Sequence, residues 1–354
     1  MNKPCMSLNI EISELSDGRY AVFNRVSKKT YFIGEMEHYI LISLDGTKEI
    51  EDLAKNFTML KINDLERLIN QFEKIGFLKG AEVKRKNSIT RITMAVFNPN
   101  KYFKQDSLFV QIFSFIITYC SIPVFFLGVW FSRSYFREYI LLLSNKFSIT
   151  TIFLIILMTI AILFFHEISH VVIAKKYGVN VPESGIILYW FMPGAYVNLS
   201  CVAFLKSKRK KICIFSAGIL FNLFISGLAL LGCRKAGSTV QLYLLWLGID
   251  NFFNAIFNLF VCLKLDGYLI LKEIIEEKNL REHSFQYLKS LGLNVIKKLG
   301  VFSKKDALNF YNYKTLNEGR NANEGVYLAY GISALLYIPI LILSIVLTWI
   351  SYLY

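Results

Sequence analysis

Two histidines and a glutamate occur in the pattern His-Glu-x-x-His, as His166, Glu167 and His170. Residues four apart lie on one face of a helix, so both imidazoles can bind one metal ion. The pattern is typical of Zn²⁺, with the glutamate beside the ion, where it can take a proton from a bound water. A buried structural histidine pair is the alternative, although the chain has only 4 histidines among 354 residues.

These residues stand within an apolar run, from Ile149 to Ile173, that is long enough to cross the hydrocarbon core of a bilayer. Ionisable groups are costly inside a membrane, so their presence there indicates a functional site. A pair of histidines still lacks a third protein ligand, which is often a carboxylate in catalytic zinc sites. Asp266 is the natural candidate, and such a ligand set leaves one position open for a water whose pKa the ion lowers.

The composition predicts a multi-span α-helical membrane protein. Hydrophobic residues make up 54% of the chain and the mean hydropathy is +0.43, which excludes an ordinary soluble domain. The net charge of +14 favours cytoplasmic loops and contact with the anionic lipids of a bilayer. Nucleic acid is not an expected partner, because no basic patch accompanies a known reader motif. The 6 cysteines include no Cys-x-x-Cys pair and predict no disulfide framework.

About five apolar segments are long enough to span a bilayer as helices. They lie at 107–131, 148–174, 211–232, 240–264 and 328–352. Lysine and arginine concentrate in a linker at 81–106, before the third span, and in a segment at 266–325, so the positive-inside rule places these regions and the N-terminus in the cytoplasm. Residues 1–90 contain no apolar signal segment. The expected location is therefore the cell membrane, with several passes.

This topology brings the candidate ligands to one side of the membrane. Within the transmembrane region at 107–265, the second and fourth spans both run toward the cytoplasm. The second span carries the two histidines near its inner end, and the fourth leads into Asp266. The histidine pair and the carboxylate are therefore expected at a similar depth.

Residues 1–80 predict a small α+β domain with a winged-helix-like plan. Two β-rich runs, at 20–26 and 29–33, form a hairpin pattern, and three helical patterns follow it. The first helix is expected at 35–44, Thr47 is the expected N-cap of the second, and the third is expected at 63–75, where Gly76 stops it.

Residues 18–80 resemble the PqqD-like domains that recognise leader peptides in pathways for ribosomally made, modified peptides. The best-matching stretches are Ile42-Ser-Leu-Asp-Gly-Thr47 and Phe72-Glu-Lys-Ile-Gly-Phe-Leu78. In that family the leader peptide adds as a strand to the edge of the hairpin. The resemblance implies that this domain binds a precursor peptide. A cytoplasmic stability or dimerisation domain is the alternative.

Residues 148–270 resemble the catalytic core of the site-2 protease family of intramembrane zinc metalloproteases, in particular a branch of peptide zinc metalloproteases. The matching motifs are His166-Glu167-x-x-His170, Ala217-Gly218-x-x-x-Asn222, and Asn258 followed by Leu265-Asp266-Gly267. The resemblance implies that the two histidines and Asp266 bind zinc and that Glu167 is the general base. Two positions depart from the family pattern, since Ile219 and Val261 replace prolines and make helix continuation easier.

The segment at 184–203 is apolar but is interrupted by glycine and proline, which argues against a simple span. By resemblance it is a membrane-dipping hairpin beside the site, with a strand edge that could hold substrate in an extended form. A structural re-entrant loop buried against helices is the alternative.

Taken together, the residues and the resemblance predict a zinc metalloendopeptidase that cuts a ribosomally made precursor or modified peptide, as in bacteriocin-like maturation. Asn222 and Asn258 are candidates for binding substrate or stabilising the oxyanion. A peptide-modifying enzyme or an exporter is an expected partner. Two alternatives are peptide export or self-immunity without cleavage, and cleavage of a membrane-bound regulator. The four-residue zinc and base set argues against the first, and the leader-recognition-like domain argues against the second.

Overall fold

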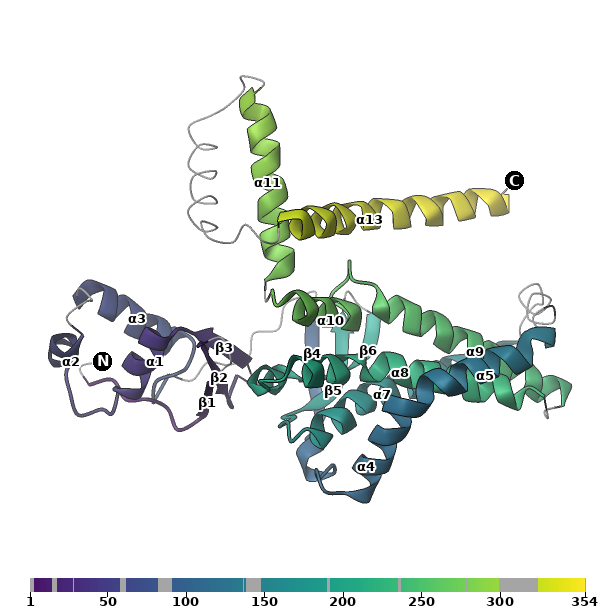
Figure 1. Ribbon diagram of the computed structural model, residues 1–354, viewed down its shortest axis with the longest axis horizontal. Helices are drawn as coiled ribbons and strands as arrows, with labels where there is room; N and C mark the ends of the chain where they lie inside the picture. Colours follow the sequence, from purple (N-terminus) through teal and green to yellow (C-terminus); the bar gives the residue numbers. More distant parts are fainter. Residues whose placement is uncertain are drawn as a thin grey trace. The chain divides into compact units, whose positions relative to one another are not determined.

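The structure is a computed structural model of the chain (Figure 1). It describes residues 3–14, 18–27, 29–57, 62–81, 91–135, 137, 148–189, 192–234, 237–277, 279–298 and 324–353. The chain divides into two compact units, Met1–Ala255 and Ile256–Tyr354.

The first unit begins with a three-stranded antiparallel sheet in the order β1-β2-β3, which shares a core with three helices (Figure 1). The elements are β1 (Ile10–Glu14), β2 (Tyr20–Asn24), β3 (Lys29–Ile33), α1 (Glu35–Ile42), α2 (Ile50–Asn56) and α3 (Ile62–Lys74). The predicted hairpin and three helices are present, whereas β1 was not predicted.

The helix ends in this region show where local sequence signals held and where they failed. Gly76 adopts a left-handed φ of 80° just after α3, and the N–H of Phe77 bonds to the carbonyl of Phe72, so the predicted stop is confirmed. Thr47 is not the N-cap of α2, and that prediction was wrong. Its N–H and its hydroxyl both donate to Asp45, and Glu49 takes the cap position instead.

Four helices in the described residues are long and apolar enough to cross a membrane. They are Leu108–Tyr135, which includes α4 (Leu108–Phe115) and α5 (Ser121–Ser132), then α7 (Ile149–Lys176), α8 (Lys208–Gly232), and Val240–Leu259 within α9 (Ser238–Leu259). These agree with the first four predicted spans. The fifth, at 328–352, falls in α13 (Glu324–Leu353), and its role as a span stays a prediction.

A second antiparallel sheet lies beside the helices of the first unit, in the order β4-β5-β6. Its strands are β4 (Arg91–Phe97), β5 (Ser184–Tyr189) and β6 (Met192–Val197), and a short 3-10 helix, η4 (Ser200–Phe204), follows. The segment predicted as a hairpin at 184–203 therefore does form one, and β6 packs against α7.

The predicted linker at 81–106 is not entirely a linker, because it supplies β4. Residues 82–90, with the basic cluster predicted there, lie outside the described residues. A Cβ added to Gly185 would meet the carbonyl of Met94 and lie 2.8 Å from the nitrogen of Val96, so glycine is what allows β4 to approach β5.

The second unit contains the end of α9, then α10 (Asp266–Ile275), α11 (Leu280–Lys298) and α13. Tyr268, Leu280 and Tyr327 form a core in which tyrosine predominates. Much of the predicted basic segment at 266–325 is helical, and residues 299–323 lie outside the described residues.

The two departures from the proline pattern have different outcomes. Helix α8 continues through Ile219, as the absence of proline predicts. Helix α9 stops at Leu259, two residues before Val261, although no proline stops it. A Cβ on Gly267 would meet the carbonyl of Leu259, so the returning chain lies directly against the helix end.

We predict that the crossing of α5 and α8 is sensitive to added volume. A Cβ on Gly128 would lie 2.5 Å from the carbonyl oxygen of Gly227, and a Cβ on Gly227 would lie 2.5 Å from that of Val124. Backbones this close require small residues. Gly227→Val should destabilise the protein by about 1–3 kcal/mol, measured as a lower thermal unfolding temperature in detergent. Gly292→Ala, whose Cβ meets nothing within 4 Å, is the control. Equal unfolding temperatures for Gly227→Val and the wild type would contradict the close approach of α5 and α8.

Candidate metal centre

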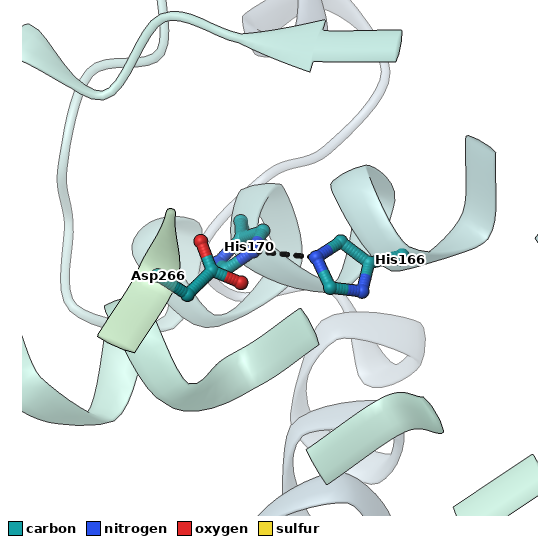
Figure 2. Close-up of side chains that lie close together, drawn as sticks. All are labelled: His166, His170 and Asp266. Carbon is teal, nitrogen blue, oxygen red and sulfur yellow. Dashed lines mark hydrogen bonds between the residues drawn. The ribbon is translucent and has the colours of Figure 1, made fainter. Parts of the chain in front are cut away.

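Two imidazoles lie one turn apart near the C-terminal end of α7. His166 is 4% exposed and His170 is 2% exposed. Their Nε2 atoms are 3.4 Å apart, the contact drawn as a dashed line in Figure 2. The other ring nitrogen of His170, Nδ1, lies 2.8 Å from the carbonyl oxygen of Ile214 on α8. A carbonyl only accepts, so Nδ1 carries the proton and the Nε2 of His170 offers a lone pair.

The spacing of these nitrogens fits a tetrahedral zinc ion. Zinc binds histidine nitrogen at about 2.0–2.1 Å, and tetrahedral geometry then separates two such nitrogens by about 3.4 Å. The observed separation between His166 and His170 is the same. The hydrogen bond from His170 to Ile214 is also the kind of contact that orients a metal-bound imidazole. The two histidines therefore fit the metal predicted from the sequence.

Helix α8 leaves space for an ion at Gly218. A Cβ added there would meet the Nε2 and Cε1 atoms of His166 and would lie 2.6 Å from the Nε2 of His170. Any larger side chain would therefore occupy the position beside the nitrogens. One turn further along α8, Asn222 is 2% exposed, and its Oδ1 is a buried atom without a hydrogen-bond partner among the described residues. A buried acceptor of this kind is suited to a ligand donor.

The third predicted ligand, Asp266, is the first residue of α10. The ligand atoms of His166, His170 and Asp266 all lie within 4.8 Å of one another, so the three side chains form a group that could hold a metal ion (Figure 2). The three ligands predicted from residue type and topology are thus the three that are brought together.

Glu167 and Asn258, the other predicted site residues, are both half-buried on helices. Glu167 is half-buried on α7, directly after the first histidine. Asn258 is half-buried in the last turn of α9. Their roles as general base and substrate contact stay predictions. Sequence reasoning missed the part played by Ile214, because a backbone carbonyl leaves no signature in the residue type. It named Gly218 only for its resemblance to a family motif.

In a comparison with protein families, residues 152–234 match the model of peptidase family M50. The matched residues include both histidines, Gly218 and Asn222. The chain carries a peptidase family M50 domain. Comparisons with curated proteins and with solved structures found no match.

This domain is that of a zinc metallopeptidase of the site-2 protease family, so the enzyme class and the zinc cofactor predicted from the sequence are confirmed. A peptidase acts on peptide, which confirms the coarse substrate class. The chain is a membrane protein with several candidate spans. Because the family match begins at residue 152, it does not bear on the PqqD-like resemblance of the N-terminal region, which stays a prediction.

We predict that Gly218→Ala lowers zinc binding, because the added methyl group would collide with both imidazoles. The zinc content of protein purified in detergent should fall at least about tenfold relative to the wild type, as measured by mass spectrometry of the metal. Gly237→Ala is the control, since its Cβ meets nothing within 4 Å. A Gly218→Ala protein with full zinc content would contradict this account of the glycine.

Proposed function

We propose that the chain is an intramembrane zinc metalloprotease that hydrolyses a peptide bond in a ribosomally made precursor or modified peptide. The observation that carries the proposal is the approach of His166, His170 and Asp266 within 4.8 Å, with the histidines on a long apolar helix. The M50 domain supplies the class of enzyme, and the N-terminal domain supplies the argument for a precursor peptide. Maturation of a bacteriocin-like natural product is the process that fits both.

The roles of the residues follow from their chemistry. His166, His170 and Asp266 hold the ion, which when bound supplies a Lewis acid that lowers the pKa of water and polarises the scissile carbonyl. Glu167 takes the proton of the attacking water and passes it to the leaving amine. The buried Oδ1 of Asn222, which has no hydrogen-bond partner among the described residues, accepts from a donor such as a substrate N–H.

Asn258 is the second proposed substrate contact. It lies in the last turn of α9, and the chain after that turn leads to Asp266. A half-buried amide at this place could orient the peptide group next to the scissile bond.

The place of the histidines on α7 suits hydrolysis at the membrane boundary. Lys175 and Lys176 end the helix, and Lys175 follows His170 by five positions, which is a rise of about 7.5 Å along the axis. Lysines near the end of a span lie at the interface with water. Water therefore needs to enter only a short distance to reach the site. We place this boundary, and the N-terminus, on the cytoplasmic side.

The N-terminal domain is proposed to recognise the precursor. Its sheet presents edge strands, to which an extended peptide can add. Because the domain belongs to the same chain as the catalytic site, a peptide held there has a raised effective concentration at that site, without tight binding by the catalytic residues.

Two other functions are the alternatives. Peptide export or self-immunity without cleavage would need no general base, so retention of function after loss of Glu167 would favour it. Cleavage of a membrane-bound regulator would use the same chemistry on a different substrate, and the N-terminal domain, which resembles a leader-recognition domain, argues against it.

We predict that Glu167→Gln abolishes hydrolysis while zinc stays bound, because the amide cannot accept a proton. The purified protein would be incubated with a peptide library, and new termini would be read by mass spectrometry. Cleavage should fall by at least about a hundredfold. Glu51→Gln, on the exposed face of α2, is the matched control. Undiminished cleavage by Glu167→Gln would reject the general-base assignment.

We predict that Asp266→Asn lowers the zinc content at least about tenfold, because a neutral amide is a poor zinc ligand. Asp250→Asn is the control, since it removes a carboxylate that is not in the proposed ligand set. Metal analysis at neutral pH gives the readout, and it needs no substrate. Stoichiometric zinc in the Asp266→Asn protein would remove this residue from the ligand set.

A further inference from the structure

The N-terminal sheet is covered on both of its faces. Val22 belongs to the core shared with α1–α3, so the neighbouring Phe23 points to the opposite face of β2. Phe23 is nevertheless only 1% exposed. Part of its cover is η4, where the ring of Phe204 meets Phe23 edge-on at 6.5 Å, and the hydroxyl of Thr30 donates to the carbonyl of Ser200 at 2.9 Å.

The place of this contact matters, because η4 follows β6 after two residues and β6 packs against α7. The N-terminal domain is therefore docked at the base of the hairpin that lies beside the metal-binding helix. The first unit thus includes both a sheet from the N-terminal domain and a sheet from the catalytic region.

A cavity of about 480 Å³ lies where these two parts meet. Glu11 of β1 and Arg25, just after β2, line it from the N-terminal domain. Val96 of β4 and the following Asn98 line it from the second sheet, and Asn180 lines it from the connection between α7 and β5. The volume falls within the range of sites that bind small ligands or short peptide segments.

The backbone around the cavity favours an extended peptide. Strands β1 and β4 are both edge strands of their sheets, and an edge strand offers N–H and C=O groups along its outer side. A bulge between Ala95 and Phe97 takes Val96 out of register with β5, and Val96 is 59% exposed. Backbone groups of this kind match the main chain of a peptide in strand conformation.

The side chains of the wall also favour peptide over an anionic ligand. Among the described residues of the wall, Arg25 is the single cation, and its Nε donates to Glu11 at 2.7 Å. With Glu183, the wall carries two carboxylates against this single guanidinium, so it does not suit a phosphate. Asn98 and Asn180 are exposed, and their amides can both donate to and accept from peptide groups.

We propose that this cavity is a peptide-binding site that holds an extended segment of the substrate between the N-terminal domain and β4. The proposal rests on the proposed peptidase function, and it adds a contact remote from the scissile bond. A segment held here is bound by both parts of the first unit, which restricts the path of the chain toward the metal centre and raises its effective concentration there.

The test uses the full chain with the Glu167→Gln substitution, in detergent, so that the probe is not cut. The probe is a fluorescein-labelled hexapeptide, Thr-Val-Thr-Lys-Thr-Val, with binding followed by fluorescence anisotropy. A second probe has the same sequence with alternate backbone nitrogens methylated, which removes half of the main-chain donors. The methylated probe should bind at least about tenfold more weakly, because strand addition needs those donors.

A pair of variants on β4 locates the binding. Ala95→Trp places a large ring in the cavity wall, whereas Ile92→Trp places it at an exposed position on the same strand, outside the wall. We expect Ala95→Trp to weaken binding at least about tenfold and Ile92→Trp to change it less than about twofold.

Three results would overturn the proposal: equal binding of the two probes, equal binding by the two variants, or no binding up to about 1 mM peptide. The probe-pair comparison needs no cavity variant, so it stays decisive even where Ala95→Trp fails to fold. Failure of the peptidase assay would reject the proposed function instead, since binding is measured here without cleavage.

Discussion

The structure depends on one electrostatic constraint, the approach of two imidazole nitrogens to 3.4 Å inside a long apolar helix. Polar atoms of this kind are costly in a region of low dielectric unless a partner compensates them. One partner is fixed by the fold, since the carbonyl of Ile214 holds the proton of His170 on the far side of its ring. The Nε2 of His170 therefore faces the Nε2 of His166, and the separation of these two nitrogens suits a bound zinc ion.

The packing of α8 against α7 follows from the same constraint. Helix α8 brings Ile214 close enough to accept a hydrogen bond and, one turn later, presents Gly218 beside the nitrogens. A second close contact, between Gly227 and Gly128, holds α8 against α5. Glycine thus serves two needs on one helix, because it opens space for a ligand at one position and removes space between helices at another.

Local sequence signals were enough for the parts of the fold that local interactions determine. The His-Glu-x-x-His spacing, the apolar runs and the stop at Gly76 depend on neighbours within a few residues, and each was predicted correctly. The prediction of Asp266 as the third metal ligand came from topology, since the direction of the spans limits which side chains can meet.

The missed features depend on distant or competing partners. Strand β4 alternates apolar and polar residues only weakly, and its partner β5 lies about ninety residues further along the chain. Thr47 has a residue type that favours the N-cap position. Its N–H and its hydroxyl instead both donate to Asp45, two residues earlier. The end of α9 at Leu259 was also missed, because no proline marks it in the sequence. What accompanies the helix end is a tertiary contact with Gly267.

The pairing of β4 with β5 sets an order of events during synthesis. Strand β4 emerges from the ribosome before two membrane spans, and its partner emerges only after both. The N-terminal core, whose contacts are closed by residue 81, can fold much earlier. The strand therefore stays unpaired until the second span has been made, and an unpaired strand with apolar residues such as Ile92 and Met94 is open to wrong pairing during this interval.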